Sequence, residues 1–313
     1  MSKKPLILVT CKQMQNELPL HRERIESLGY EVLAPELVGQ QFTAAQLAQY
    51  SEGMVGIIAG DDELNRSFFD ATPDLKVLIR WGIGMDSVDH EAAADHDVVV
   101  RNTPGVFGRE VADSAFAYVL MLARGHHGVD SDVRNGSWPK REGITLGENR
   151  VGVVGLGAIG RQVAQRGLGF GMEVVGFDPY VDSEHVAEGV SRVSLDELLS
   201  TSRFVILTCP LTEDTFHLID TSALARMRRD AYLINVARGP VVDEVALCAA
   251  LTEGLITGAG LDVFEVEPLP VDSPLRELEN VILGAHNGSN TREGVQLASR
   301  VAVDLLLKEL AQR

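Results

Sequence analysis

The stretch that decides the fold is VGVVGLGAIGR, residues 151–161. Its first part, Val151–Val154, is a short apolar run that predicts a buried parallel strand. Gly155 permits a tight turn out of the strand, and Gly157 leaves room for a diphosphate to approach the backbone. Gly160 lets the following helix pack closely on the sheet. The order of strand, glycines and helix predicts a dinucleotide site; a glycine-rich turn with a purely structural role is the alternative.

The residues after the turn indicate which dinucleotide binds. The helix is predicted over 159–169, and its first N–H groups carry partial positive charge that favours a diphosphate, so Ala158 and Ile159 are predicted cofactor contacts. A second apolar run, Glu173–Phe177, ends at Asp178. A carboxylate there accepts hydrogen bonds from a ribose 2′-OH and repels a 2′-phosphate. We therefore predict NAD rather than NADP.

Composition excludes several classes of protein. The 313 residues suffice for two domains, and no apolar stretch reaches the ~18–20 residues that span a bilayer. The net charge of −17 argues against a nucleic-acid or anionic-membrane partner, and requires specific arginines for an anionic substrate. Cys11, Cys209 and Cys248 are widely spaced without a metal-binding pattern, so we expect no metal site and a reduced, cytoplasmic protein. The N-terminus, MSKKPLILVT, is interpreted as a first strand and not as a signal peptide.

Apolar runs alternate with helical patterns along the chain, which predicts an α/β fold with parallel sheets. The strands expected before the glycine turn are Leu6–Val9, Glu31–Leu33, Val55–Ala59, Val77–Arg80 and Val98–Arg101. Those expected from the turn onward are Val151–Val154, Glu173–Phe177, Phe204–Thr208, Tyr232–Val236, Gly258–Asp262 and Val281–Leu283. Two longer helices are expected, Val111–Arg124 and Thr291–Leu310. The first is interpreted as core, with a dimer contact as the alternative.

Three polar residues follow three successive predicted strands. Arg238 follows YLINVA, Glu267 lies in GLDVFEVEPLP, and His286 ends VILGAH. Ligands of open α/β sheets bind at the carboxyl ends of the strands. Histidine exchanges protons near neutral pH, a carboxylate favours its charged form, and arginine can hold a substrate carboxylate. A histidine after a strand often has only a structural role, but the three together fit hydride transfer with acid/base catalysis.

Several segments in this order resemble the D-isomer-specific 2-hydroxyacid dehydrogenase family. They are RWGIGMDSVD (80–89), NTPGVFGREVADSAF (102–116), VGVVGLGAIGR (151–161), INVARGPVVDEVAL (234–247), GAGLDVFEVEP (258–268) and GAHNGSNT (284–291). The resemblance implies an NAD-dependent dehydrogenase of small D-2-hydroxy acids. In it Arg238 holds the substrate, Glu267 orients the histidine, and His286 is the general acid/base.

The resemblance also implies further contacts. The backbone of Gly82, Ile83 and Gly84 would hold the substrate carboxylate. Cys209 and Pro210 would line the adenosine side, and the Ala237 carbonyl and Asp262 would hold the nicotinamide carboxamide.

The architecture implied by the family is two doubly wound parallel-sheet domains. A Rossmann cofactor domain, residues 102–289, is inserted into a smaller flavodoxin-like substrate domain, residues 1–101 plus 290–313. The family's active site lies in the cleft between such domains, which closes by a hinge motion, and its members usually form homodimers through the cofactor domain.

Departures from the family pattern leave the substrate open. Ala285 and Asn287 flank the histidine where a proline and an apolar residue are common. Asp61 and Asp62 stand where phosphoglycerate enzymes often carry Arg-Ser, which disfavours a phosphate unless they are merely solvated loop acids. Arg80 could still meet a phosphate or a second carboxylate, or it could be an ordinary interdomain ion-pair residue. The substrate is therefore of the 3-phosphoglycerate type or of the hydroxypyruvate/glyoxylate type.

Two other functions fit the same pattern. Some relatives on this fold are NAD(H)-sensing corepressors, but the chain lacks the low-complexity extensions that would favour such a role. A formate or phosphite dehydrogenase of the same superfamily is the other alternative. Formate enzymes pair the histidine with glutamine, so Glu267 favours the hydroxyacid branch.

Overall fold

The computed structural model describes residues 4–182 and 186–313 and divides into two compact units. Unit 1 is Met1–Phe107 with Asn290–Arg313, and unit 2 is Gly108–Ser289. The sequence prediction placed the first division at 101/102. The chain stays with unit 1 beyond that point because Thr103 hydrogen-bonds to Gly82 through both its backbone N–H and its hydroxyl. The first three residues of the predicted substrate domain lie outside the described residues.

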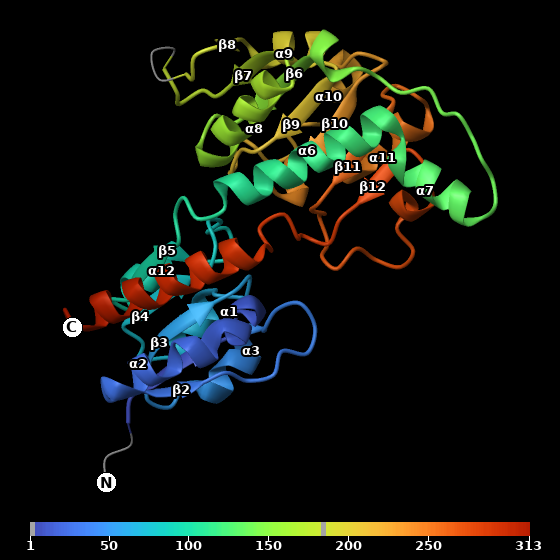
Figure 1. The fold of residues 1–313 in the computed structure, drawn as a ribbon. Coiled ribbons are helices and arrows are strands. Elements are labelled where there is room, and N and C mark those ends of the chain that lie inside the picture. Colours follow the sequence, from blue (N-terminus) through green and yellow to red (C-terminus); the bar gives the residue numbers. More distant parts are fainter. Residues whose placement is uncertain (1–3, 183–185) are drawn as a thin grey trace. The chain divides into compact units, whose positions relative to one another are not determined.

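Unit 1 is built on a parallel sheet with strand order β2-β1-β3-β4-β5 (Figure 1). Its strands are β1 Leu6–Val9, β2 Glu31–Leu33, β3 Met54–Ala59, β4 Val77–Arg80 and β5 Val99–Asn102. This is the order of doubly wound, flavodoxin-like sheets, which confirms that part of the fold prediction. The central strands β3 and β4 are almost wholly buried because helices cover both faces.

Two groups of helices cover this sheet. The long helix α12 packs on β3, β4 and β5 and against α1, so the C-terminal segment belongs to unit 1. The helices α3, α4 and α5 pack in succession over the core around Phe68 and Phe69. The α-helices of unit 1 are α1 Lys12–Glu17, α2 Arg22–Ser27, α3 Ala44–Leu47, α4 Arg66–Asp70, α5 His90–Asp95 and α12 Arg292–Leu310. Short 3-10 turns are η1 Leu18–Leu20 and η2 Ala48–Tyr50.

Unit 2 is built on a parallel sheet with strand order β12-β11-β10-β9-β6-β7-β8. Its strands are β6 Arg150–Val154, β7 Glu173–Phe177, β8 Val190–Arg192, β9 Phe204–Leu207, β10 Tyr232–Asn235, β11 Gly258–Leu261 and β12 Val281–Leu283. The order reverses beside β6, as in a Rossmann fold, and the glycine turn follows this strand. The sequence reading missed β8, a three-residue edge strand with no buried residue.

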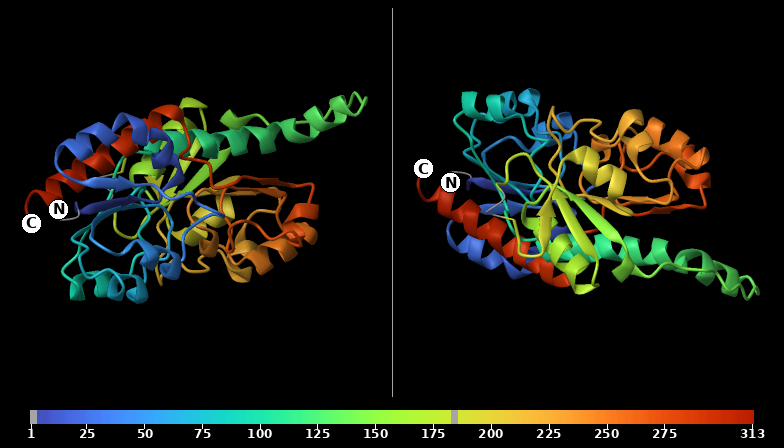
Figure 2. Two further views of the ribbon diagram at one scale, coloured as in Figure 1. Left: turned by 90° about the horizontal axis from the view of Figure 1, so that it is seen from below. Right: turned by 90° about the horizontal axis from the view of Figure 1, so that it is seen from above.

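The helices α6 and α8 pack together on one face of this sheet, while α9, α10 and α11 cover other parts of it. The α-helices of unit 2 are α6 Gly108–Arg124, α7 His126–Arg134, α8 Ala158–Gly169, α9 Leu195–Thr201, α10 Thr221–Arg226 and α11 Glu244–Thr252. Its 3-10 turns include η3 Leu146–Glu148, η5 Gly239–Val241 and η6 Pro274–Glu277. Helix α7 and the segment after it project from the rest of the unit (Figure 2).

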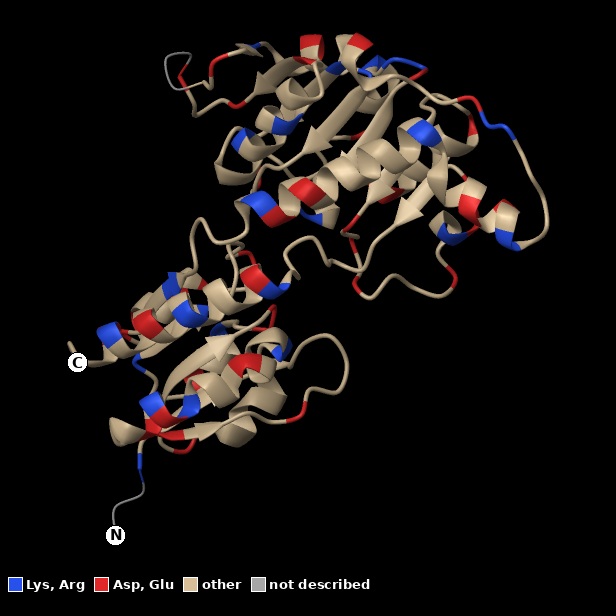
Figure 3. Cartoon of the chain, in the orientation of Figure 1, with Lys and Arg blue, Asp and Glu red and all other residues tan. Residues whose placement is uncertain are grey.

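Helix α6 carries charge only near its ends. No charged residue lies between Asp113 and Arg124, and Figure 3 shows this middle stretch without acidic or basic colour. Its buried residues include Ala115, Tyr118 and Val119, which face the sheet. The helix is therefore core, as predicted. Within the described residues, no helix has the length and apolar character that crossing a bilayer requires.

Candidate active site

The glycine turn has the geometry that each glycine was predicted to allow. Gly155 has a φ of 93°, and a Cβ there would lie 2.8 Å from the backbone of Cys209. A Cβ on Gly160 would lie 1.9 Å from the Gly155 carbonyl oxygen, so the helix approaches its own turn at this point. At Gly157 a Cβ would meet nothing within 4 Å, so the space beside this residue is open to a ligand.

The first turn of α8 is left without a side-chain cap. Its N-cap is Gly157, whereas Ser194, Asp220 and Asp243 accept backbone hydrogen bonds at the starts of α9, α10 and α11. Uncapped N–H groups at a helix start, beside open space, suit a diphosphate. These residues fit the dinucleotide that the glycine pattern predicts.

Asp178, directly after β7, also holds the turn in place. One carboxylate oxygen accepts a hydrogen bond from the Leu156 N–H at 2.8 Å, and the other accepts from the Tyr180 N–H at 2.9 Å. Each oxygen keeps a lone pair for a further donor such as a ribose hydroxyl. The prediction gave this carboxylate only a ligand role, but it has a structural role as well.

The adenosine-side residues follow β9. Cys209 is buried, and desolvation raises the pKa of its thiol to about 11, so it is a neutral, weakly polar surface near the glycine turn. The carbonyl of Pro210 accepts a hydrogen bond from the Thr215 hydroxyl at 2.7 Å. That bond fixes the loop in which Pro210 lies.

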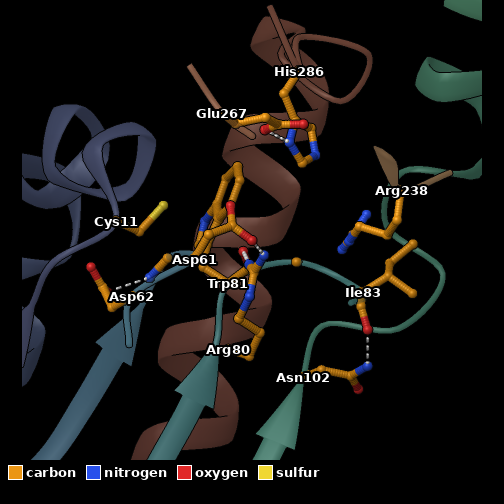
Figure 4. Close-up of polar contacts among 12 residues, drawn as sticks. Cys11, Asp61, Asp62, Arg80, Trp81, Ile83, Asn102, Arg238, Glu267 and His286 are labelled. Atoms are coloured by element: carbon orange, nitrogen blue, oxygen red, sulfur yellow. Dashed lines mark hydrogen bonds and ion pairs between the residues drawn. The ribbon is translucent and has the colours of Figure 1, made fainter. Parts of the chain in front are cut away.

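The predicted catalytic residues lie after neighbouring strands. Arg238 follows β10, Glu267 follows β11 and His286 follows β12, and these strands pair in parallel. Nδ1 of His286 lies 2.7 Å from Oε2 of Glu267, with about a quarter of each side chain exposed (Figure 4). The other carboxylate oxygen of Glu267 accepts from the Phe264 N–H at 3.0 Å. This arrangement holds Nδ1 against a carboxylate and fixes the orientation of the ring.

Arg238 is held by its own strand end. Its guanidinium donates to the Ala237 carbonyl at 2.8 Å, and its carbonyl accepts from the Asn235 side chain at 2.9 Å. A Cβ on the next residue, Gly239, would lie 1.8 Å from the Phe264 carbonyl carbon, so η5 packs tightly on the loop that carries Glu267. The Ala237 carbonyl, a predicted nicotinamide ligand, thus already accepts one hydrogen bond.

Asp262 is the centre of a hydrogen-bond network that the sequence reading did not foresee. It is buried, and its carbonyl accepts the His286 N–H at 2.7 Å. Its carboxylate accepts from the Asn287 N–H at 3.2 Å, the Gly288 N–H at 2.8 Å and the Tyr118 hydroxyl at 3.0 Å. A tyrosine among the buried residues of α6 was the only sequence signal for the last of these bonds.

The predicted substrate loop of unit 1 follows β4. The Gly82 N–H donates to the Thr103 hydroxyl at 2.9 Å, and the Ile83 carbonyl accepts from Asn102 at 2.7 Å (Figure 4). No described residue accepts a hydrogen bond from the N–H groups of Ile83 and Gly84. Of the three predicted backbone ligands, Ile83 and Gly84 therefore keep N–H groups for an anion, while that of Gly82 is occupied.

Arg80 is buried and engaged within unit 1. Its guanidinium forms an ion pair with Asp61 and donates to the Trp81 carbonyl. The alternative raised for Arg80 was an interdomain ion pair, whereas the partner observed, Asp61, lies in the same unit as Arg80.

The solvated-loop alternative is wrong for Asp62. Only 1% of this residue is exposed, and its carboxylate accepts from the Thr10 hydroxyl, the Phe42 N–H and the Gly60 N–H. Desolvation raises the pKa of its carboxyl, while the hydrogen bonds lower it. Asp62 ties three loop segments together at the ends of β1 and β3.

One further cluster lies in unit 2. Within the described part of the chain, ligand atoms of His217, Asp243 and Glu265 lie within 4.8 Å of one another. His217 Nε2 lies 2.9 Å from Glu265, whose carboxylate also accepts the Glu244 N–H. Asp243 caps α11. The three groups thus have protein partners that account for their placement.

Comparisons of the chain with a family model, with curated proteins and with solved structures all point to one family. The family "D-isomer specific 2-hydroxyacid dehydrogenase, NAD binding domain" matches residues 116–288. A glyoxylate reductase of Korarchaeum cryptofilum is 42% identical over 253 residues, covering 78% of this chain and 76% of the relative. A D-3-phosphoglycerate dehydrogenase of Methanocaldococcus jannaschii is 36% identical over 93% of this chain, which spans only 56% of that relative. The structure of D-lactate dehydrogenase from Aquifex aeolicus, complexed with NAD and lactic acid, aligns with a TM-score of 0.87 at 27% identity, over 98% of this chain and 95% of that one.

Proposed function

Since the chain belongs to the D-isomer-specific 2-hydroxyacid dehydrogenase family, an NAD-dependent family of oxidoreductases, we propose that it interconverts a small unphosphorylated 2-oxo acid with its 2-hydroxy acid. Glyoxylate and hydroxypyruvate are the leading substrates. The observation that carries this proposal is the pairing of His286 with Glu267 at a strand end of the unit that matches the NAD-binding domain. Unit 2 is then the cofactor domain and unit 1 the substrate domain.

The catalytic roles follow from the side-chain chemistry. Bound NADH supplies the hydride. His286 donates a proton from Nε2 to the substrate oxygen during reduction and takes it back during oxidation, while Glu267 stabilises the charged ring. Arg238 binds the substrate carboxylate and polarises the neighbouring carbonyl. The N–H groups of Ile83 and Gly84 are proposed as further ligands of that carboxylate.

The cofactor contacts are proposed from the turn geometry. The open side of Gly157 and the uncapped N–H groups at Ala158 and Ile159 would meet the diphosphate. The remaining acceptor capacity of Asp178 suits the adenosine ribose. Around the nicotinamide, Asp262 has one carboxylate lone pair beyond its three protein donors, enough for one carboxamide N–H.

The substrate is proposed to lack a phosphate because Arg80 is neutralised. Its ion pair with Asp61 and its bond to the Trp81 carbonyl take up the cation nearest to the Gly82–Gly84 loop in the sequence. A phosphate carries up to two negative charges and needs unpaired cations. Glyoxylate and hydroxypyruvate make no such demand.

A substitution at His286 tests the catalytic assignment. The residue has a φ of 51°, a conformation that asparagine tolerates, so His286→Asn removes the imidazole with little backbone strain. We expect kcat to fall by about 10²–10⁴ while NADH binding, followed by fluorescence, persists. His217→Asn is the matched control, because His217 also has positive φ (50°) and also pairs with a glutamate. Full activity in the His286 variant would remove the assignment.

A panel of 2-oxo acids tests the substrate. Glyoxylate, hydroxypyruvate, pyruvate and 3-phosphohydroxypyruvate are compared by kcat/KM with NADH and with NADPH. We expect the unphosphorylated acids to be preferred, and Asp61→Ala to raise the relative kcat/KM of the phosphorylated acid. A clear preference of the unaltered protein for 3-phosphohydroxypyruvate would contradict the proposal.

A homodimer through unit 2 and a cytoplasmic location complete the proposal. Helix α7 has no buried residue, and the segment after it carries Trp138 with 79% of its surface exposed, an apolar area suited to a second copy. Light scattering should give twice the chain mass of 33.9 kDa, and Trp138→Asp should halve the measured mass.

All three cysteines are free, as expected in a reducing compartment, and cell fractionation tests the cytoplasmic location.

A further inference from the structure

Asp262 holds the backbone that carries His286. Three successive N–H groups, those of His286, Asn287 and Gly288, all donate to oxygen atoms of Asp262. Because these donors converge on one residue, the orientation of the Asp262 carboxylate decides where residues 287 and 288 lie.

These hydrogen bonds hold His286 in an unusual backbone conformation, with a φ of 51°. Such a conformation is strained for a non-glycine residue and persists only where the surroundings enforce it. The bonds from the Asn287 and Gly288 N–H groups to Asp262 restrain the backbone on the C-terminal side of His286. If the carboxylate turned, the loop could relax and the imidazole would move with it.

Tyr118 of α6 holds the carboxylate from the other side. Its hydroxyl donates to the same oxygen that accepts the Asn287 N–H. The ring occupies a slot made by two glycines: a Cβ on Gly260 would lie 2.8 Å from the Tyr118 Cβ, and one on Gly284 would lie 2.1 Å from its hydroxyl. Burial and the negative charge of Asp262 raise the pKa of Tyr118, so its hydroxyl keeps its proton and remains a hydrogen-bond donor over the pH range of the assays.

We propose that Tyr118 is a positioning residue for the acid/base histidine, acting through Asp262 on the 286–288 loop. Its hydroxyl bonds to Asp262 and not to a catalytic side chain. Its hydrogen bond fixes the carboxylate orientation, the carboxylate fixes the loop, and the loop sets His286 against Glu267. The inference rests on the proposed role of His286.

Tyr118→Phe tests it, because the ring still fills the slot and only the hydroxyl is lost. We expect kcat to fall about tenfold with KM for the 2-oxo acid unchanged, since a small displacement of a catalytic group acts on the transition state. Amide hydrogen exchange at Asn287 and Gly288 should speed up about fivefold. Tyr232→Phe is the matched control: its ring stacks on Phe204 at the start of β10, and no described residue bonds to its hydroxyl. That variant should change neither quantity.

The route through Asp262 is tested by a double-mutant cycle. In an Asp262→Ala background, which lacks the acceptor and is itself impaired, Tyr118→Phe should cause less than a twofold further loss of kcat. A tenfold further loss, or unchanged kcat and amide exchange in the single variant, would overturn the inference. The exchange measurement needs no turnover. If the unaltered protein reduced none of the 2-oxo acids, the proposed function would fail while faster exchange at 287–288 would still support the structural link.

Discussion

Replacing Glu267 by glutamine removes a charge and keeps the shape of the side chain. The Phe264 N–H would hold the amide oxygen, as it now holds Oε1, so the amide nitrogen would face Nδ1 of His286. The charged ring loses a carboxylate at 2.7 Å in an environment only about one quarter exposed. Hydrogen bonds to charged groups contribute about 1.5–3 kcal/mol, and 1.36 kcal/mol corresponds to one pH unit, so we expect a shift of at least about one unit.

The sign of the shift is the same in both directions of reaction. Reduction needs the protonated ring and declines as pH rises through its apparent pKa, so the decline should begin about one unit lower in the variant. Oxidation needs the neutral ring, and its pH profile should also rise about one unit lower, with a reduced plateau because the amide N–H facing Nδ1 favours the tautomer that carries its proton on Nε2. The assay is kcat/KM from pH 5 to 10 with the best 2-oxo acid and with its 2-hydroxy acid. Glu265→Gln is the matched control, because Glu265 pairs with His217. Superimposable profiles for Glu267→Gln and the unaltered protein would refute the pairing as a functional one.

Three further predictions concern the cofactor turn and the core of unit 1. Gly160→Ala places a Cβ 1.9 Å from a carbonyl oxygen and should weaken NADH binding at least about 100-fold by fluorescence titration, whereas Gly169→Ala, with nothing within 4 Å, should not. Asp178→Ala should weaken NADH binding about tenfold and reduce the preference for NADH over NADPH, measured as the ratio of kcat/KM. Asp62→Ala leaves buried donors unpaired and should lower the free energy of unfolding by about 3 kcal/mol in urea, while the exposed Asp74→Ala should change it by less than about 0.5 kcal/mol.

The sequence alone predicted the features that depend on a regular apolar pattern or on a backbone conformation that only glycine adopts easily. The glycine turn, the parallel strands and the order of the three strand-end residues were all predictable, since each depends on local chemistry. Strand ends differed by a residue, as at Val99–Asn102, because terminal hydrogen bonds depend on the neighbouring strand. Strand β8 was not predicted, because this short edge strand has no apolar run.

Contacts between distant segments were beyond the sequence. Asp62 looked like a loop acid, and only the converging Thr10, Phe42 and Gly60 donors make its burial possible. Tyr118 and Asp262 are 144 residues apart in the sequence. Helical periodicity predicts that Tyr118 is buried, but it does not predict which residue accepts its hydrogen bond. Pairings of this kind depend on side-chain geometry across layers, which no local pattern encodes.

Asp178 has both a structural role and a proposed ligand role, which affects how cofactor preference could change over evolution. The carboxylate that suits a ribose hydroxyl also anchors the Leu156 N–H in the glycine turn. A single substitution toward NADP would therefore loosen the turn before it gained any phosphate contact. Lineages that made the switch would need a compensating mutation first, so cofactor preference at this position should be epistatic and historically conservative.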